Sequence, residues 1–276
     1  MSIFVDINGG DNAPSSVLEG CVLAREKYGA DVKEVESITQ GLQALAGNKG
    51  SAFVSAGSTG ELILKAQRIL GRQEGIARGA IAGILPSAKS PFILIDSGAC
   101  VRCTPQILAQ FAQMGSVYAQ KVFGISKPRV ALLNIGTEED KGDELRRETN
   151  ALLKNSSLNY VGNAEAREVP FGVCEVLVTD GFSGNVFLKT YEGTALAMIS
   201  QLKRIYSANS MTKFSALFVK KGLRDMRRKM DYNQYGGAAI LGFNGILIKA
   251  HGASKAAAIC AAIEQAGKLI GYSRLT

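Results

Sequence analysis

Small polar residues end five apolar segments of this chain, and a glycine-rich turn follows each of them. The five motifs are SIFVDINGGDNAP, SAFVSAGSTG, FILIDSGAC, RVALLNIGTEEDKGDEL and EVLVTDGFSGN. In an open parallel sheet, the loops after the carboxyl ends of the strands share one edge, so we expect these turns to meet in a single crevice. The polar residues at the five strand ends are Asp6, Ser55, Asp96, Asn134 and Asp180.

Two of these turns have the composition of anion-binding sites. SAGSTG and DGFSGN each precede a helical pattern, and the unpaired N–H groups and dipole of a helix N-terminus attract negative charge. The hydroxyls of Ser58 and Thr59 add donors to the first turn, and Asn185 adds an amide to the second. Neither turn contains the GxGxxG fingerprint or the GK[ST] ending of a nucleotide-binding P-loop. Together the turns favour a phosphate-bearing substrate.

The single histidine, His251, follows an apolar segment in IKAHG. Its side chain is the only one that ordinarily titrates near neutrality, so it is a candidate proton donor, with a structural hydrogen bond as the alternative. Cys100 and Cys103 form a CxxC without a second pair of ligands, which favours a structural interpretation over a zinc or redox site.

Three acids invite a magnesium hypothesis, because Mg²⁺ prefers carboxylate oxygens. Asp6, Asp11 and Asp96 would all lie at the predicted sheet edge, yet the same residues suit helix caps. We expect no metal.

Strand and helix patterns alternate along the chain, which argues for a parallel sheet covered by helices. We expect an α/β fold with an open, mostly parallel, Rossmann-like sheet, forming a single domain over residues 1–276. The expected strands cover 2–7, 92–96, 129–134, 175–180 and 246–250, with others ending at residue 55 and near residue 160. The expected helices cover 14–29, 38–46, 61–70, 105–122, 143–154 and 254–270.

A protruding amphipathic helical hairpin is expected at residues 192–231, with helices over 192–206 and 211–230. The net charge of +8 resides here, since residues 203–229 hold nine basic residues and one acid, while the remainder holds 23 of each sign. The apolar stripe would pack within the hairpin or at a dimer interface. The basic stripe would either be solvated or attract an acidic protein, an anionic membrane surface or nucleic acid. The stripe consists of Leu196, Ile199, Leu202, Ile205, Phe214, Leu217, Phe218, Leu223 and Met226.

Composition indicates an ordinary globular protein. The chain has 276 residues, 46% of them hydrophobic, and no apolar run approaches the roughly 20 residues that span a bilayer. MSIFVDI lacks the features of a signal peptide, and five scattered cysteines do not suggest a disulfide framework. We expect a cytoplasmic protein.

The order of the motifs NGGDNAP, SAGSTG, MGSVYAQ, LLNIGTEEDKGDEL, GNAEAR, VTDGFSGNVFLKTYEG, YGGAAILG and IKAHGAS closely resembles the PlsX family of acyl-carrier-protein:phosphate acyltransferases. The resemblance implies transfer of a long acyl chain from acyl carrier protein to inorganic phosphate, giving acyl phosphate for phospholipid synthesis. It also implies a homodimer at the inner face of the cell membrane, where a membrane acyl-phosphate:glycerol-3-phosphate acyltransferase is a possible partner. No cofactor is implied.

The chain departs from the family pattern at several positions. Asn12 replaces the histidine of GGDHAP, Ser58 replaces the asparagine of SAGNTG, and DSGACVR replaces DVGANVD, with Arg102 in place of an acid. Family members also carry tens of additional residues where this chain has residues 30–51.

Phosphate is a competent nucleophile and a thioester is already activated, so the reaction requires positioning, charge neutralisation and oxyanion stabilisation. We expect the SAGSTG turn to hold phosphate, with positive charge from two lysines, an oxyanion donor at the start of the following helix and His251 protonating the leaving thiol. Asp180 would orient Lys189 or a neighbouring loop. The candidate catalytic residues are Asn185, His251, Lys189, Lys141 and Asp180. The candidate substrate-binding residues are Ser55, Gly57, Ser58, Thr59, Gly60, Asp6, Gly9, Gly10, Asp11, Asn134, Gly136, Thr137, Gly181 and Gly184.

Three other functions are compatible with parts of the sequence. A phosphotransacetylase-like enzyme would use acyl coenzyme A in place of acyl carrier protein. A nicotinamide-dependent dehydrogenase lacks its fingerprint. A nucleic-acid-binding module would use the basic hairpin but lacks interleaved aromatic residues, and we expect no nucleic-acid partner.

Overall fold

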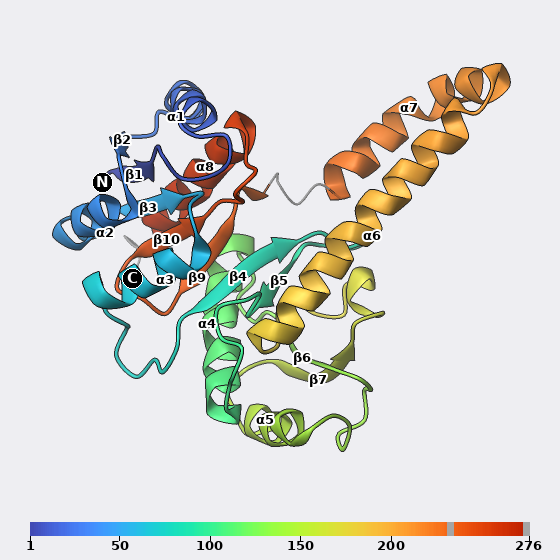
Figure 1. The fold of residues 1–276 in the computed structure, drawn as a ribbon. Coiled ribbons are helices and arrows are strands. Elements are labelled where there is room, and N and C mark those ends of the chain that lie inside the picture. Colours follow the sequence, from blue (N-terminus) through green and yellow to red (C-terminus); the bar gives the residue numbers. More distant parts are fainter. Residues whose placement is uncertain (231–234, 273–276) are drawn as a thin grey trace.

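The computed structural model describes residues 1–230 and 235–272. Within them, the strands form one twisted sheet with the order β2-β1-β3-β10-β9-β4-β5-β8-β6-β7 (Figure 1). The strands are β1 (Ile3–Asp6), β2 (Val32–Val35), β3 (Ala52–Ser55), β4 (Ala80–Leu85), β5 (Phe92–Ile95), β6 (Val130–Asn134), β7 (Tyr160–Glu165), β8 (Val176–Val178), β9 (Ala238–Leu241) and β10 (Ile246–Lys249).

The sheet consists of two parallel groups that run in opposite directions. β2, β1, β3 and β10 are parallel to one another, as are β5, β8, β6 and β7, and the pairs β10–β9, β9–β4 and β4–β5 are antiparallel. The mostly parallel α/β fold is therefore confirmed. The expectation of one shared edge is wrong, because three reversals separate the carboxyl ends of β1, β3 and β10 from those of β5, β6 and β8.

Helices cover both faces of the sheet (Figure 1). Alternation along β1 directs Ile3 and Val5 into the core beneath α1, α4 and α8, and Phe4 into the core beneath α2 and α3. The helices are α1 (Ser15–Tyr28), α2 (Ile38–Gly47), α3 (Thr59–Ile69), α4 (Pro105–Phe123), α5 (Glu144–Lys154), α6 (Gly181–Ser207), α7 (Ser210–Met230) and α8 (Ala256–Tyr272), with a 3₁₀ turn at Val169–Phe171.

The predicted helices begin and end at the capping residues that the sequence provides. Gly29 adopts a left-handed conformation with φ of 61° and closes α1, while Ser37 caps α2 through the N–H of Gln40. Gly20 allows α1 to approach α8, since a Cβ there would lie 2.7 Å from the Cβ of Ile259. Capping residues therefore set the ends of these helices, and a small residue allows α1 to pack against α8.

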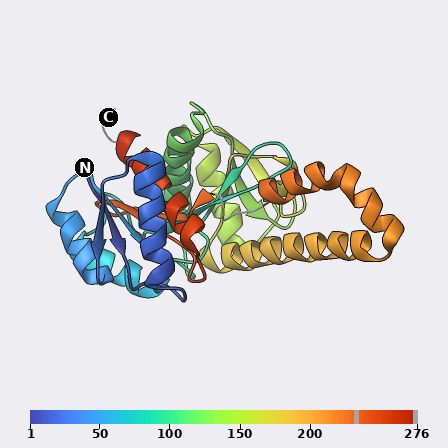
Figure 2. The ribbon, with the colours of Figure 1, turned by 90° about the horizontal axis from the view of Figure 1, so that it is seen from above.

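The hairpin of α6 and α7 projects from the body of the molecule (Figures 1 and 2). α6 begins at Gly181, well before the predicted start, so one continuous helix joins the sheet edge to the hairpin. Several predicted stripe residues face solvent, with Leu196 and Phe218 exposed by 62% and 79%. The side chains of Leu217 and Met226, and the predicted hairpin end at residue 231, lie outside what the structure describes. No helix in the described ranges is long and apolar enough to cross a membrane.

Candidate functional site

The loops after β1, β3 and β10 contact one another; we call residues 7–14, 56–58 and 250–255 the first loop group. The hydroxyl of Ser55 donates to Oδ2 of Asp6 at 2.7 Å and accepts the N–H of Gly57 at 3.0 Å. The N–H of Asp11 donates to the carbonyl of Gly252 at 2.8 Å. Three loops distant in sequence, each containing predicted site residues, therefore meet at the carboxyl ends of parallel strands.

Close backbone approach in this group requires glycine. A Cβ at Gly9 would lie 2.6 Å from Oδ2 of Asp6 and 2.7 Å from the nitrogen of Gly57. Gly10 has a φ of +100°, and a Cβ there would lie 2.8 Å from the carbonyl oxygen of Gly252. The NGG sequence thus shapes the loop, independent of any ligand.

His251 lies exposed in the first loop group. Its Nδ1 accepts the N–H of Ala253 at 3.1 Å, so in the neutral ring the proton resides on Nε2. Asn12, which replaces the histidine of the family motif, donates to the carbonyl of Ala253 at 3.1 Å. The β1 loop therefore holds the loop that carries His251. The Nε2–H group of His251 remains available as a donor.

The loops after β5, β6 and β8, residues 96–104, 135–143 and 179–180, form a second loop group together with the start of α6. Asp180 caps α6 by accepting the N–H groups of Phe182 and Ser183 at 3.0 and 2.9 Å. Its Oδ2 forms an ion pair with Arg146 and accepts the hydroxyl of Ser183 at 2.8 Å. Burial alone would raise the pKa of Asp180, but Ser183 and Arg146 outweigh it and hold the pKa below its usual range.

Asp96 is fully buried, and backbone donors surround its carboxylate. The N–H groups of Ile81 and Ala99 donate to Oδ1 at 2.9 and 3.0 Å, and that of Cys100 donates to Oδ2 at 2.6 Å. Burial raises its pKa despite these bonds. A Cβ at Gly184 would lie 1.9 Å from the carbonyl oxygen of Asp96, so this glycine allows α6 to pack on the loop. These contacts favour a structural role for Asp96 over metal binding.

The remaining predicted residues of the second group mainly hold loops. Buried Asn134 donates to the carbonyl of Lys141 at 3.1 Å, and Asn185 donates to the carbonyl of Ser97 at 3.2 Å. The side chain of Lys189 is 54% exposed and pairs with Glu192 at 3.0 Å. Asp180 is paired with Arg146 and not with Lys189, which leaves the orientation of a neighbouring loop as the other role expected for it. Gly136 and Thr137 lie in the loop after β6, and Gly181 begins α6.

No hydrogen bond or ion pair between described residues links the two loop groups. Ser58, Thr59 and Gly60 belong with the first group, because they follow Gly57 and begin α3. The sequence analysis did not identify Arg146, since GDELRRE resembles any solvated helix start. It also did not identify Lys249, since the lysine that ends ILIK resembles an ordinary strand terminus.

Cys100 and Cys103 are free thiols whose sulfur atoms lie 3.2 Å apart in the loop after β5. Burial, followed by the hydrogen bond with Cys100, raises the pKa of Cys103 well above its usual range. Cys103 is therefore a thiol and not a thiolate at neutral pH, which disfavours a nucleophilic role.

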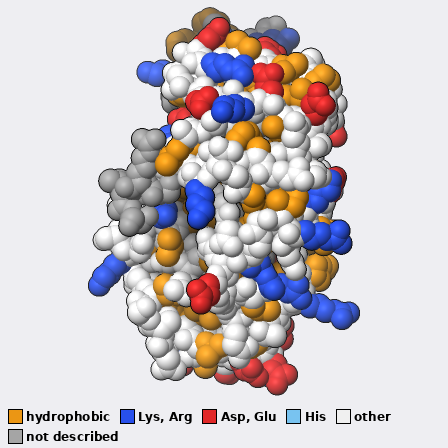
Figure 3. All heavy atoms as spheres, turned by 90° about the vertical axis from the view of Figure 1, so that its left-hand side faces the viewer, with side chains coloured by type: hydrophobic (Ala, Val, Ile, Leu, Met, Phe, Trp, Pro, Cys, Tyr) orange, Lys and Arg blue, Asp and Glu red, His pale blue; other side chains and the backbone are white. Residues whose placement is uncertain are grey.

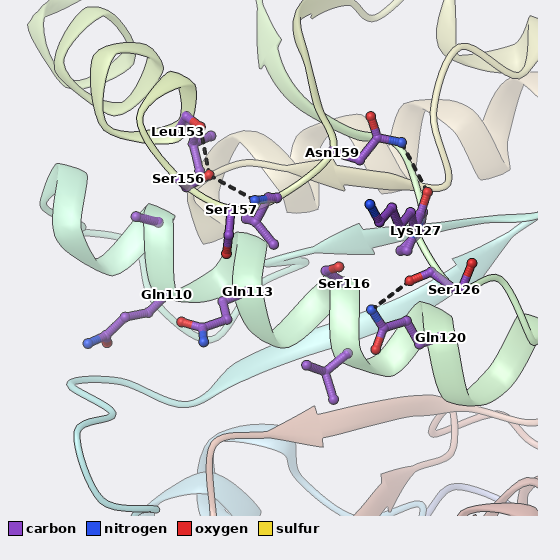
Figure 4. Close-up of a pocket in the computed structure, with 14 residues that line it drawn as sticks. Gln110, Gln113, Ser116, Gln120, Ser126, Lys127, Leu153, Ser156, Ser157 and Asn159 are labelled. Atoms are coloured by element: carbon purple, nitrogen blue, oxygen red, sulfur yellow. Dashed lines mark hydrogen bonds between the residues drawn. The ribbon is translucent and has the colours of Figure 1, made fainter.

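Two hollows lie away from both loop groups. One of about 1120 Å³ lies between α3, α4 and the hairpin of β9 and β10. The other, of about 400 Å³, lies between α4 and residues 126–128 and 153–159 (Figure 4). Its polar groups are used locally: Gln120 donates to the carbonyl of Ser126 at 3.1 Å and Asn159 to that of Lys127 at 3.0 Å. Neither hollow is lined by a predicted site residue.

A family model described as "fatty acid synthesis protein" matches residues 29–273. The phosphate acyltransferase of Caldanaerobacter subterraneus subsp. tengcongensis is 41% identical over 312 aligned positions, which cover 98% of this chain and 94% of that protein. The phosphate acyltransferase of Lysinibacillus sphaericus is 41% identical over 315 positions, covering 99% and 96%. Both alignments exceed the 276 residues of this chain, so the relatives carry residues that it lacks.

Solved structures of low identity share the fold. A phosphotransacetylase from Streptococcus pyogenes has a TM-score of 0.60 and 16% identity, covering 97% of this chain and 94% of that one. A branched-chain phosphotransacylase from Enterococcus faecalis has a TM-score of 0.58 and 14% identity, covering 97% and 99%. An isocitrate dehydrogenase from Methylococcus capsulatus has a TM-score of 0.52 and 14% identity, covering 98% and 86%. The same fold thus serves different chemistries.

Proposed function

The chain belongs to the fatty acid synthesis protein family, and from this premise we propose that it transfers a long-chain fatty acyl group from acyl carrier protein to inorganic phosphate, giving acyl phosphate for phospholipid synthesis. The observation that carries the proposal is 41% identity over 98% of the chain to a protein named phosphate acyltransferase. Acyl carrier protein as donor and acyl phosphate as product are inferred from the ordered motifs of the PlsX family.

The first loop group supplies the phosphate donors and the proton donor that this reaction needs, and the second loop group supplies a candidate oxyanion donor. An oxygen of phosphate attacks the thioester carbonyl carbon, the C–S bond breaks, and the leaving thiolate takes a proton. We assign phosphate to the start of α3 at Ser58, Thr59 and Gly60, and the proton to Nε2 of the imidazolium form of His251, which becomes neutral imidazole as the thiol leaves. Asn185 uses one amide hydrogen on Ser97, and we assign the other to the oxyanion.

The hairpin is assigned to assembly and membrane attachment. Exposed apolar residues on both helices support packing against a second copy, and exposed lysines such as Lys213 and Lys220 support contact with an anionic membrane surface. The face at the α1–α2 end carries both signs of charge interspersed (Figure 3), so the basic excess is not spread over that face. We propose a homodimer, peripherally associated with the inner face of the cell membrane, near an acyltransferase that consumes acyl phosphate.

The test is incubation with palmitoyl-acyl carrier protein, with and without phosphate, followed by detection of palmitoyl phosphate by mass spectrometry. Formation of palmitoyl phosphate only when phosphate is present supports the proposal. No product at any protein concentration would contradict it. A preparation of the His251→Ala variant controls for contaminating enzymes.

Acyl coenzyme A is the alternative donor that the sequence leaves open. Parallel assays with palmitoyl-acyl carrier protein and palmitoyl coenzyme A at equal concentration separate the two. We expect the larger kcat/KM with acyl carrier protein, and a larger value with coenzyme A would transfer the assignment to that donor.

A further inference from the structure

Lys249 is the last residue of β10 and lies in register with Ser55, the last residue of the neighbouring parallel strand β3. Its ammonium group donates to the carbonyl of Ala56 at 3.3 Å and also to the carbonyl of Ala250. These carbonyls belong to the loops that lead to Ser58 and to His251. Lys249 therefore lies between the two loops to which phosphate and the proton donor were assigned.

The charge of Lys249 has no direct partner. Among the described residues, no carboxylate forms an ion pair with its Nζ, and the two carbonyls leave one of its three N–H donors without an acceptor. Burial lowers its pKa to about 8, an effect that the carboxylate of Asp11 partly opposes. Partly buried cations are usually paired, so this one is suited to an anionic ligand.

The charged groups on the neighbouring strand and helix ends are already engaged or lie at the surface. Asp6 on β1 accepts the hydroxyl of Ser55, and Glu61 in the first turn of α3 pairs with Lys65 at 2.6 Å. His251, on the same loop, is exposed and uses Nδ1 for a backbone N–H. Asp11 is the acid that acts on Lys249 without a direct bond.

The start of α3 supplies neutral donors beside the loop that Lys249 contacts. Ser58 caps only the N–H of Glu61, at a long 3.5 Å, and no described acceptor takes the N–H groups of Thr59 or Gly60. The first turn of a helix directs such N–H groups and the positive end of its dipole toward an anion. A cation and free N–H groups thus border the same short loop, residues 56–58.

We propose that Nζ of Lys249, together with the N–H groups of Thr59 and Gly60, binds the phosphate that acts as nucleophile. This inference rests on the proposed function for the identity of the anion. It adds Lys249 to the sequence-based candidates Lys141 and Lys189, of which Lys189 is paired with Glu192. A bound dianion would favour the protonated lysine and hold the phosphate in place for attack on the thioester.

The test is calorimetric titration of the whole protein with inorganic phosphate at pH 7.0, which needs no acyl donor. Removing a charge-assisted hydrogen bond in Lys249→Met should weaken phosphate binding about 10- to 100-fold. Lys249→Arg keeps the positive charge and should bind within about threefold of the wild type. Lys33→Met removes an exposed lysine of β2, outside both loop groups, and should bind as the wild type does.

The pH dependence separates a direct contact from a structural role. Sulfate is a dianion that does not titrate between pH 7 and 9.5, so any change in its affinity over this range belongs to the protein. The wild type should lose affinity as the pH rises through about 8, where Lys249 deprotonates. Lys249→Arg should not show this loss, because arginine stays charged. A Lys249→Met protein that fails to fold leaves this comparison intact.

The proposal is overturned if the wild type does not bind phosphate, if Lys249→Met binds it normally, or if both pH profiles coincide. Steady-state kinetics add an independent check, since Lys249→Met should raise the KM for phosphate and leave the KM for the acyl donor unchanged. Phosphate binding through Lys249 without acyl phosphate formation would contradict the proposed function and support this inference. Acyl phosphate formation with the same KM for phosphate in Lys249→Met as in the wild type would support the proposed function and contradict this inference.

Discussion

The guanidinium of Arg146 on α5 pairs with the carboxylate of Asp180, the cap of α6. Both side chains are largely buried, with exposures of 14% and 7%. Nη1 of the same arginine pairs with Asp143, the cap of α5, at 2.9 Å. One cation therefore joins the first turns of two helices, and it fixes α6 where that helix leaves the sheet to form the hairpin.

Replacing Asp180 should destabilise the protein in two separable steps. Asp180→Asn keeps an oxygen that can cap α6 but removes the buried counter-ion of Arg146, which keeps only the exposed Asp143, whereas Asp180→Ala removes both the cap and the ion pair. Because breaking a buried pair costs about 3–5 kcal/mol and losing a cap about 1 kcal/mol, Ala should be the more damaging substitution. Urea denaturation of both variants measures the free energy of unfolding. Equal stability of wild type and Asp180→Asn would show that the pair contributes nothing.

The pair should also make stability depend on pH. The folded-state pKa of Asp180 lies below its unfolded value of about 3.9, so its contribution is present above that value and is lost as the pH falls through the folded pKa. The difference in unfolding free energy between wild type and Asp180→Asn should be constant above about pH 5 and shrink below about pH 4. Other carboxyl groups, such as Glu175 beside Arg129, are present in both proteins, so their contributions cancel in the difference in unfolding free energy. A difference that is independent of pH would contradict this account.

The sequence predicted much of the fold because its end signals are local. Apolar runs such as FILI and VALLN are buried strands, and residues such as Gly29 end helices as their conformation requires. β4 and β9 were missed because AIAGIL and AAIL are rich in small residues and carry no strong strand pattern. Their antiparallel pairing is a long-range property, yet it separates the carboxyl ends of the two strand groups.

The sequence predicted which loops of the first group meet, but it did not predict which side chains contact one another. NGG and SAGSTG do meet, because β1 and β3 are adjacent and parallel. The partner of Asp180 could not be predicted from spacing, since Arg146 lies 34 residues away in the first turn of a polar helix. The unpaired charge of Lys249 depends on which carbonyls surround it, and only the folded chain specifies these.

Phe214 and Phe218 of α7 should contribute to membrane contact. Their rings form an edge-to-face pair with centroids 5.5 Å apart, and both side chains are mostly exposed beside basic residues. The double variant Phe214→Ser, Phe218→Ser should bind anionic phospholipid vesicles more weakly in flotation assays, because burial of each aromatic ring in the interface contributes about 1.5–3 kcal/mol. Phe171→Ser, on an exposed residue elsewhere, is the matched control. Unchanged flotation of the double variant would place membrane contact elsewhere.

His251→Ala should lower kcat by about 10²- to 10⁴-fold if Nε2 protonates the leaving thiol. The fold should be retained, because the side chain is exposed and makes one backbone contact. A synthetic acyl thioester with an acidic aryl thiol needs no proton to leave, so the variant should lose much less activity with that donor. An equal loss with both donors would show that His251 acts in some way other than proton transfer.

Asn185→Ala distinguishes catalysis from loop support at the start of α6. Its amide already donates to the carbonyl of Ser97, and a Cβ at Gly98 would lie 3.1 Å from its Nδ2, so a purely structural residue would lower stability and leave kcat intact. An oxyanion donor would instead lower kcat by about 10²- to 10³-fold with little change in either KM, because the interaction strengthens only in the transition state. We expect the second pattern in steady-state kinetics, accompanied by a loss of about 1 kcal/mol in urea denaturation from the missing hydrogen bond. Normal turnover in a destabilised variant would confine the reaction to the first loop group, where His251 and Lys249 lie.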